Sequence, residues 1–106
     1  MAKLSIIIKG RARPGKRDEV RTLFEKHLAP RAVANAAQEV VVWSADNGEP
    51  DTFYLYEIYG DPTAMEANAS APWFAEYISA VAPLLATQPE LMTATPMWMK
   101  PATTIT

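Results

Sequence analysis

Apolar and polar residues alternate along the first segment of the chain. From Leu4 to Ala12 the even-numbered positions form one face and the odd-numbered positions form the other. This period of two, rich in β-branched residues, predicts a strand over Leu4 to Ala12. Pro14 and Gly15 end it, because proline has no N–H for a β-ladder and glycine permits a turn.

The period changes after Lys16. Apolar positions then recur at the spacing of one helix face, with Asp18 and Glu19 in the first turn, where the helix dipole favours acids. Pro30 is expected to end or bend this helix, and residues 31–38 could add a further turn. The stripe comprises Val20, Leu23, Phe24, His27 and Leu28.

Two further strands are predicted at Glu39 to Ser44 and Thr52 to Tyr59, joined by the turn signal Asp46-Asn47-Gly48. Both faces of the second of these strands are apolar or aromatic, so each face needs a covering. One face carries Phe53, Leu55, Glu57 and Tyr59, and the other carries Tyr54, Tyr56 and Ile58.

Prolines mark the elements of the second half. Asp61-Pro62 is typical of a helix N-cap and first residue, and Pro72 begins another helix that Pro83 bends or ends. A last strand is predicted over Glu90 to Met99, where Pro96 indicates an edge position or a bulge.

The order β-α-β-β-α-β predicts an α+β fold, the ferredoxin-like plait, with a four-stranded antiparallel sheet and both helices on one face. Residues 1–100 would form this domain, and residues 101–106 a flexible C-terminal tail. The other sheet face is apolar and has no element left to cover it. We therefore expect a homodimer through the sheet face.

Composition narrows the class of protein. A chain of 106 residues suffices for one domain, and without cysteine it has no disulfides or thiolate sites. No leader pattern and no long apolar run is visible, so a cytoplasmic protein without membrane contact is expected. Nine of the ten Lys/Arg residues lie in residues 1–31. No basic motif interleaved with aromatic residues accompanies this charge, so no nucleic-acid partner is expected.

Three motifs in this order resemble the antibiotic biosynthesis monooxygenase family of dimeric α+β barrel proteins. They are Arg13-Pro14-Gly15-Lys16, the strand Asp51 to Tyr59 followed by Asp61, and Ala71-Pro72-Trp73-Phe74 with Ala82-Pro83-Leu84-Leu85 downstream. The resemblance implies a pocket between helices and sheet. There, small electron-rich aromatics (quinols, anthrones or polyketide-like compounds) would be oxidised with O2, without metal, flavin or other cofactor.

The chain departs from the family where members often carry two histidines, and residues 31–38 replace the usual Pro-Gly-Cys turn before the second strand. Family members often have histidine where this chain has Asn68, and Ser-Pro-His-Phe where it has Ala71-Pro72-Trp73-Phe74. A mechanism based on those histidines is therefore not expected. The alternative function is a non-catalytic or isomerase-type dimer that binds a small hydrophobic ligand.

Four residues are the catalytic candidates: Asn68, Trp73, Tyr77 and His27. Asn68 could donate to a phenolate oxygen, Trp73 could stack on an aromatic substrate, and Tyr77 could position or protonate it. His27 is the only imidazole and could shuttle protons near neutral pH. Each also has a purely structural interpretation, as a helix-end or core residue.

Tyr54, Tyr56, Met65 and Phe24 are the substrate-binding candidates. The two tyrosines would line the pocket if their sheet face looks toward the helices, and would otherwise fill the dimer core. Glu57, on the opposite face, would then lie near the two-fold axis and need Arg11 or Arg13 as a partner. Metal ligation is not expected, because one histidine and scattered carboxylates give no ligand spacing.

Overall fold

The computed structural model describes residues 2–100 and has the predicted α+β architecture. Four antiparallel strands form one sheet in the order β2-β3-β1-β4. The strands are β1 (Leu4–Arg11), β2 (Gln38–Ala45), β3 (Thr52–Tyr59) and β4 (Glu90–Ala94). The tail predicted for residues 101–106 lies outside the described residues.

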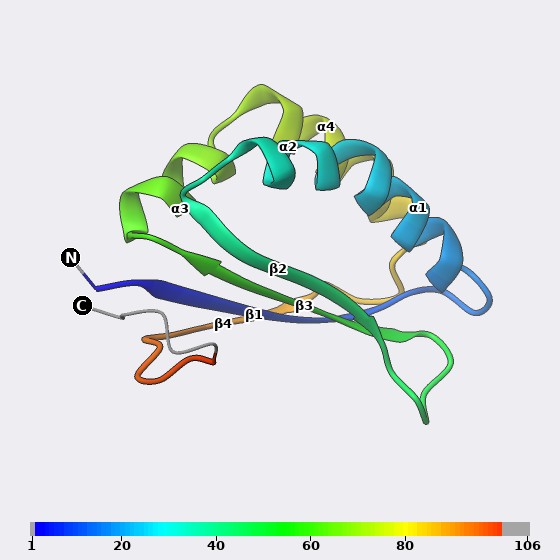
Figure 1. The fold of residues 1–106 in the computed structure, drawn as a ribbon. Coiled ribbons are helices and arrows are strands. Elements are labelled where there is room, and N and C mark those ends of the chain that lie inside the picture. Colours follow the sequence, from blue (N-terminus) through cyan, green and yellow to red (C-terminus); the bar gives the residue numbers. More distant parts are fainter. Residues whose placement is uncertain (1, 101–106) are drawn as a thin grey trace.

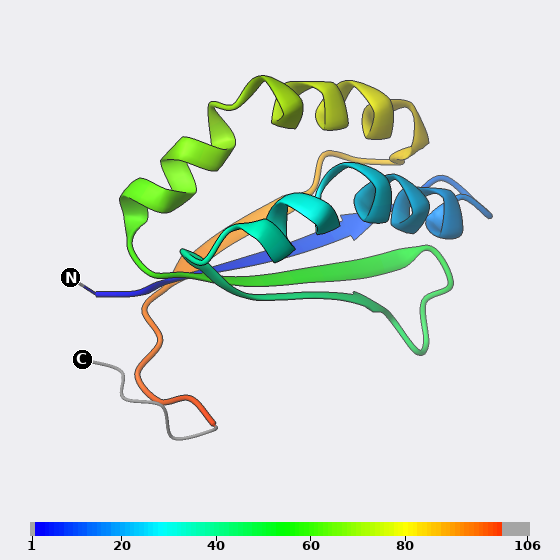
Figure 2. The same cartoon turned by 45° about the horizontal axis from the view of Figure 1, so that its top comes forward.

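All four α-helices lie over the same face of this sheet (Figure 1). The view turned by 45° shows α1 and α2 over the half of the sheet that holds β2 and β3. In the same view α3 and α4 arch over the half that holds β1 and β4 (Figure 2). No helix among the described residues is long and apolar enough to cross a membrane.

The predicted first helix is two helices. α1 (Arg17–His27) ends at Leu28, and α2 (Ala29–Ala34) follows at once with Pro30 in its first turn. Pro30 therefore both interrupts the helix and begins the next one, since its fixed φ suits a helix start. Val20 and Phe24 are buried beneath α1, as their spacing predicts.

The second helical region is also broken, as the two Pro signals predict. α3 (Pro62–Ala69) is capped by Asp61, whose carboxylate accepts from the backbone N–H of Ala64 at 3.0 Å. α4 (Pro72–Val81) continues into a single 3-10 turn at Ala82–Leu84, which contains Pro83.

β4 is shorter than predicted. It ends at Ala94 instead of Met99, and it pairs only with β1, at the edge of the sheet. Pro96 explains the early end, because a residue without an N–H cannot extend the ladder. The edge position indicated by this proline is confirmed.

The register assigns every strand residue to a face. Ile6 pairs with Glu57 and Ile8 with Leu55, so these residues look toward the helices. The adjacent residues of each strand point to the opposite face, which no helix covers and which we call the open face. On it a second row crosses the whole sheet, from Val42 through Tyr56 and Ile7 to Met92.

Candidate functional site

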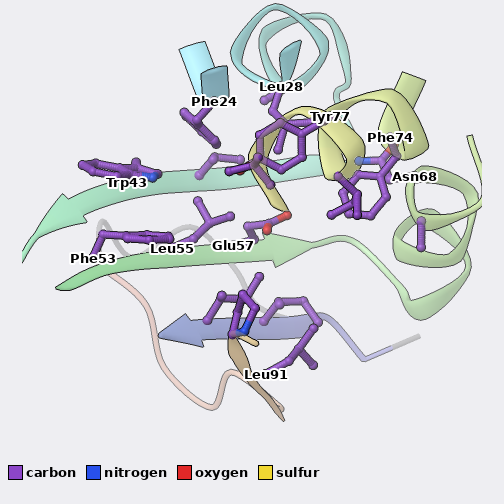
Figure 3. A pocket seen from close by; sticks show the side chains of 18 of the residues that line it. Phe24, Leu28, Trp43, Phe53, Leu55, Glu57, Asn68, Phe74, Tyr77 and Leu91 are labelled. Carbon is purple, nitrogen blue, oxygen red and sulfur yellow. The ribbon is translucent and has the colours of Figure 1, made fainter. Parts of the chain in front are cut away.

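A cavity of about 760 Å³ lies between the helices and the sheet (Figure 3). Its volume is that of a small-molecule pocket, since such pockets measure about 300–1,000 Å³. All four strands contribute the floor, the four helices contribute the roof, and residues 85–89 before β4 complete the wall. Its walls are mainly apolar, with a few residues that carry polar groups: Gln38, Trp43, Glu57, Tyr59, Asn68, Trp73, Tyr77, Thr87 and Gln88.

Five of the residues proposed from the sequence line this cavity: Phe24, Met65, Asn68, Trp73 and Tyr77. Helix periodicity brings them together, because Trp73 and Tyr77 are four residues apart on α4 and Asn68 lies in the last turn of α3. The helix pair that the two proline signals predict therefore builds one part of the cavity wall.

His27 does not line the cavity. It is half-buried at the end of α1, and its ring lies 6.2 Å from that of Tyr77. The helical stripe is broad, so a residue at its margin contacts the neighbouring helix instead of the sheet. His27, the candidate for proton shuttling, therefore lies apart from the candidates that line the cavity.

Tyr54 and Tyr56 also lie outside the cavity. Both are on the open face of β3, where the Tyr54 hydroxyl donates to Asp46 and Tyr56 lies 3.4 Å from the Ser5 hydroxyl. Successive side chains of a strand point to opposite faces. Because Leu55 and Glu57 face the helices, Tyr54 and Tyr56 must face away from them. The prediction that the two tyrosines bind substrate in the pocket is corrected.

Glu57 is the centre of a polar cluster that the sequence did not predict. Its Oε1 accepts from the Tyr59 hydroxyl and from Gln38 Nε2, both at 2.7 Å. Asn68 Nδ2 donates to the Tyr59 hydroxyl and to Gln38 Oε1, each at 3.2 Å. We call these four residues the Glu57 cluster. The arginine partner expected for Glu57 is therefore replaced by neutral hydrogen-bond donors.

Burial shapes the acid–base properties of this site. It raises the pKa of the Glu57 carboxyl, against the lowering effect of the hydrogen bonds from Tyr59 and Gln38. Burial likewise raises the pKa of Tyr77 to about 12, with a further contribution from the charge of Glu57. Tyr77 therefore stays protonated at neutral pH and is a hydrogen-bond donor.

Aromatic contacts form the two ends of the cavity. Trp43 stacks on Phe53 with ring centroids 5.3 Å apart and planes at 11°. At the other end the Trp73 ring meets Phe74 edge-on, and the Arg31 guanidinium lies over Trp73 at 5.1 Å. These contacts hold flat surfaces at positions where a planar ligand can stack.

Sequence reasoning missed Gln38, Glu57 and Tyr59 as site residues. The available signal was Glu57 itself, a carboxylate on an otherwise apolar face of a central strand, where an unpaired charge is costly. Gln38 gave no signal, because it approaches Glu57 only through the pairing of β2 with β3.

No metal site is formed by the described part of the chain. Within residues 2–100 no group of three or more His, Asp or Glu side chains could hold a metal ion.

Comparison with known proteins identifies the fold. No protein-family model and no curated protein matches the sequence. A candidate antibiotic biosynthesis monooxygenase from Chloroflexus aurantiacus is 24% identical, with a TM-score of 0.78 over 91% of this chain and 94% of that one. A candidate of the same name from Caulobacter crescentus is 18% identical, with a TM-score of 0.84 over 91% of each chain.

Rv0793 from Mycobacterium tuberculosis is also similar, with 18% identity and a TM-score of 0.81 over 93% of this chain and 99% of that one. The agreement spans nearly the whole of each chain, so it includes the helices that enclose the cavity. The chain therefore has the ferredoxin-like fold of proteins named as antibiotic biosynthesis monooxygenases.

Proposed function

We propose that the protein is a cofactor-independent monooxygenase that oxidises a small electron-rich aromatic compound with O2. The observation that carries the proposal is the cavity itself, an apolar space lined by one carboxyl group, two phenols and two indoles (Figure 3). The similar solved structures named as candidate monooxygenases support it.

The chemistry needs no group beyond the substrate and O2. The hydroxyl of a phenol or enol loses its proton, and the anion has carbanion character at a ring carbon that still bears a hydrogen. That carbon donates two electrons to O2 as the C–O bond forms, and the peroxide takes up the proton. The remaining hydrogen of the carbon and the outer OH then leave as water, which breaks the O–O bond and leaves one oxygen atom in the product carbonyl. The protein must supply a dry cavity and groups that stabilise the anion.

The described residues divide these tasks. Trp73 offers a face for stacking, and Tyr77 donates a hydrogen bond to the developing anion. Both donor hydrogens of Asn68 are already used within the Glu57 cluster, so we assign Asn68 the role of positioning that cluster. Phe24 and Met65 supply apolar contact.

The proposal includes a homodimer through the open face of the sheet. Val42, Tyr56 and Met92 stand in one row across that face, exposed by 47%, 37% and 48%. Pairing of two such faces would cover them and leave the helix-side cavity of each subunit free.

An oxygen electrode tests the enzymatic claim. Wild-type protein is mixed with quinols and anthrones in the presence of a metal chelator. We expect oxygen uptake above the uncatalysed rate, and a loss of about 100-fold in kcat for Tyr77→Phe, as for removal of one anion-stabilising donor. Tyr54→Phe, on the other sheet face, is the matched control and should leave the rate unchanged. Uptake that never exceeds the uncatalysed rate across the panel would refute the proposal.

A non-catalytic or isomerase-type ligand-binding dimer is the second candidate. It is favoured by the engagement of Asn68 within the cluster, which leaves the cavity with few free polar groups. Tight binding of quinols without any oxygen uptake would select this function.

A further inference from the structure

Glu57 is the one carboxyl group among the described residues that line the cavity. It lies on the central strand β3, and only 8% of it is exposed. A buried carboxylate needs compensation, yet no lysine, arginine or histidine among residues 2–100 forms an ion pair with it. Such a group is retained at a cost to stability, which points to a chemical use.

The two oxygens of Glu57 have different surroundings. Oε1 accepts both short hydrogen bonds of the cluster, from Tyr59 and Gln38. Oε2 accepts no hydrogen bond from any described residue. Oε2 is not fully enclosed by protein atoms, and Glu57 lines the cavity, so Oε2 retains access to it. The cluster thus fixes one oxygen of Glu57 and leaves the other free for a ligand. Figure 3 shows the Glu57 side chain rising from β3 among the residues that line the cavity.

The groups that face Glu57 from the neighbouring strands and helices are apolar side chains, amides and phenols. Ile6 of β1 and Val41 of β2 are its strand partners, and both are apolar. Gln38 and Asn68 are neutral amides, and the titratable neighbours are Tyr59 and Tyr77. Burial raises the pKa of both phenols, so both keep their protons at neutral pH.

We propose that Glu57 Oε2 accepts the proton of an acidic hydroxyl on the substrate, a phenol or an enol, while Tyr77 donates to the same substrate oxygen. The O–H bond breaks, the proton moves to Glu57, and the electron pair stays on the substrate. This deepens the proposed function and rests on it for the later reaction with O2. The transfer replaces a localised buried charge by one spread over an aromatic system.

The same geometry defines the substrate class. A ligand that carries its own carboxylate would place two negative charges in one apolar cavity, which raises the free energy of both. The site therefore selects compounds that are neutral when they enter and have an ionisable hydroxyl on a flat ring. Carboxylated analogues of the same ring should bind poorly.

Binding of 4-nitrophenol, a chromophoric phenol that does not consume O2, tests the assignment directly. Above its pKa the free probe is a phenolate. If Glu57 and the bound probe share one proton, the wild-type complex must therefore take up that proton from the solvent when it forms. Affinity should then fall about tenfold per pH unit in that range. In Glu57→Gln the phenolate binds without proton uptake, so the affinity should become nearly independent of pH there.

Glu66→Gln is the matched control, because Glu66 is an exposed glutamate of α3 outside the cavity lining. It should keep the wild-type pH dependence. Equal pH profiles for wild type and Glu57→Gln would overturn the proposal, whether or not the protein consumes oxygen.

A second measurement needs only the wild-type protein and so does not depend on how the variant folds. Calorimetry in two buffers of different ionisation enthalpy counts the protons taken up per bound probe. One proton above the pKa of the probe supports the assignment, and none overturns it. Proton uptake on binding combined with no oxygen uptake on any substrate would refute the monooxygenase while leaving the role of Glu57 intact.

Discussion

Trp43, in the wall of the cavity, carries a buried hydrogen-bond donor without a partner. Its indole N–H is enclosed and has no acceptor among the described residues, while its ring stacks on Phe53. A buried unsatisfied donor costs about 1–3 kcal/mol, and stacking of the ring offsets that cost. The ring and the N–H therefore have opposite effects on stability.

Trp43→Phe separates these two effects. It removes the donor and keeps an aromatic ring, so we expect the free energy of unfolding to stay within about 1 kcal/mol of wild type. Trp43→Ala removes both and should lower it by about 3 kcal/mol. Urea unfolding measures each variant. Equal losses for both variants would show that the indole N–H has an acceptor after all.

Asp46 stabilises the connection between β2 and β3. Its Oδ1 accepts from the backbone N–H groups of Gly48 and Glu49 at 2.7 Å, and its Oδ2 accepts from the Tyr54 hydroxyl. These bonds, first that of Tyr54, lower the pKa of Asp46 from 3.8 to about 2. The carboxylate is therefore favoured in the folded state.

Asp46→Asn should accordingly destabilise the protein in a pH-dependent way. A lowered pKa contributes stability that is present above pH 3.8 and is lost as the pH falls toward about 2. We expect the variant to unfold at lower urea concentration than wild type at pH 6, and the gap to close toward pH 2. A gap that is constant with pH would contradict this role.

Gly10 of β1 lies under the Phe53 ring. A Cβ at this position would stand 2.2 Å from Phe53 Cζ, so Gly10→Ala must push the ring out of its stack on Trp43. We expect a loss of about 2 kcal/mol in the free energy of unfolding. Gly48→Ala, whose Cβ would meet nothing nearer than an Asp46 oxygen at 3.6 Å, should cost much less. Similar losses in thermal unfolding would refute the steric explanation.

The elements were predictable because local signals specify them. Alternation gives the strands, and Asp61-Pro62 and Pro72 give the helix starts. The sequence does not specify which face of β3 looks inward, because Leu55 and Tyr56 are both compatible with burial. That ambiguity explains why Tyr54 and Tyr56 were assigned to the pocket and Glu57 to the opposite face.

The Glu57 cluster could not be predicted for a related reason. Gln38 and Glu57 are far apart in the chain and meet through strand pairing, while Asn68 reaches them from α3. Only the register and the helix position together bring the three side chains into contact. Trp73 and Tyr77 were accessible from sequence because one helix carries both.

At the scale of the whole molecule, the open sheet face predicts how the protein associates. Tyr56 lies in the middle of the exposed row, so Tyr56→Lys should convert a dimer into a monomer by placing a charge in the interface. Val33→Lys is the matched control, since Val33 is 89% exposed on α2, above the opposite face. Sedimentation velocity at micromolar concentration checks both. A wild-type monomer would contradict the proposed assembly.

The proposed chemistry belongs to the helix side of the molecule. There, substrate bound in the cavity is proposed to react with O2 without help from another redox group. The fate of the oxygen atoms distinguishes this reaction from simple ligand binding.

Mass spectrometry of the product formed under ¹⁸O2 is the most direct test. A turned-over anthrone or quinol should carry one labelled oxygen atom in its new carbonyl, and Tyr77→Phe should reduce the yield of labelled product. Product without label, or labelled product at the rate of a protein-free control, would contradict the account.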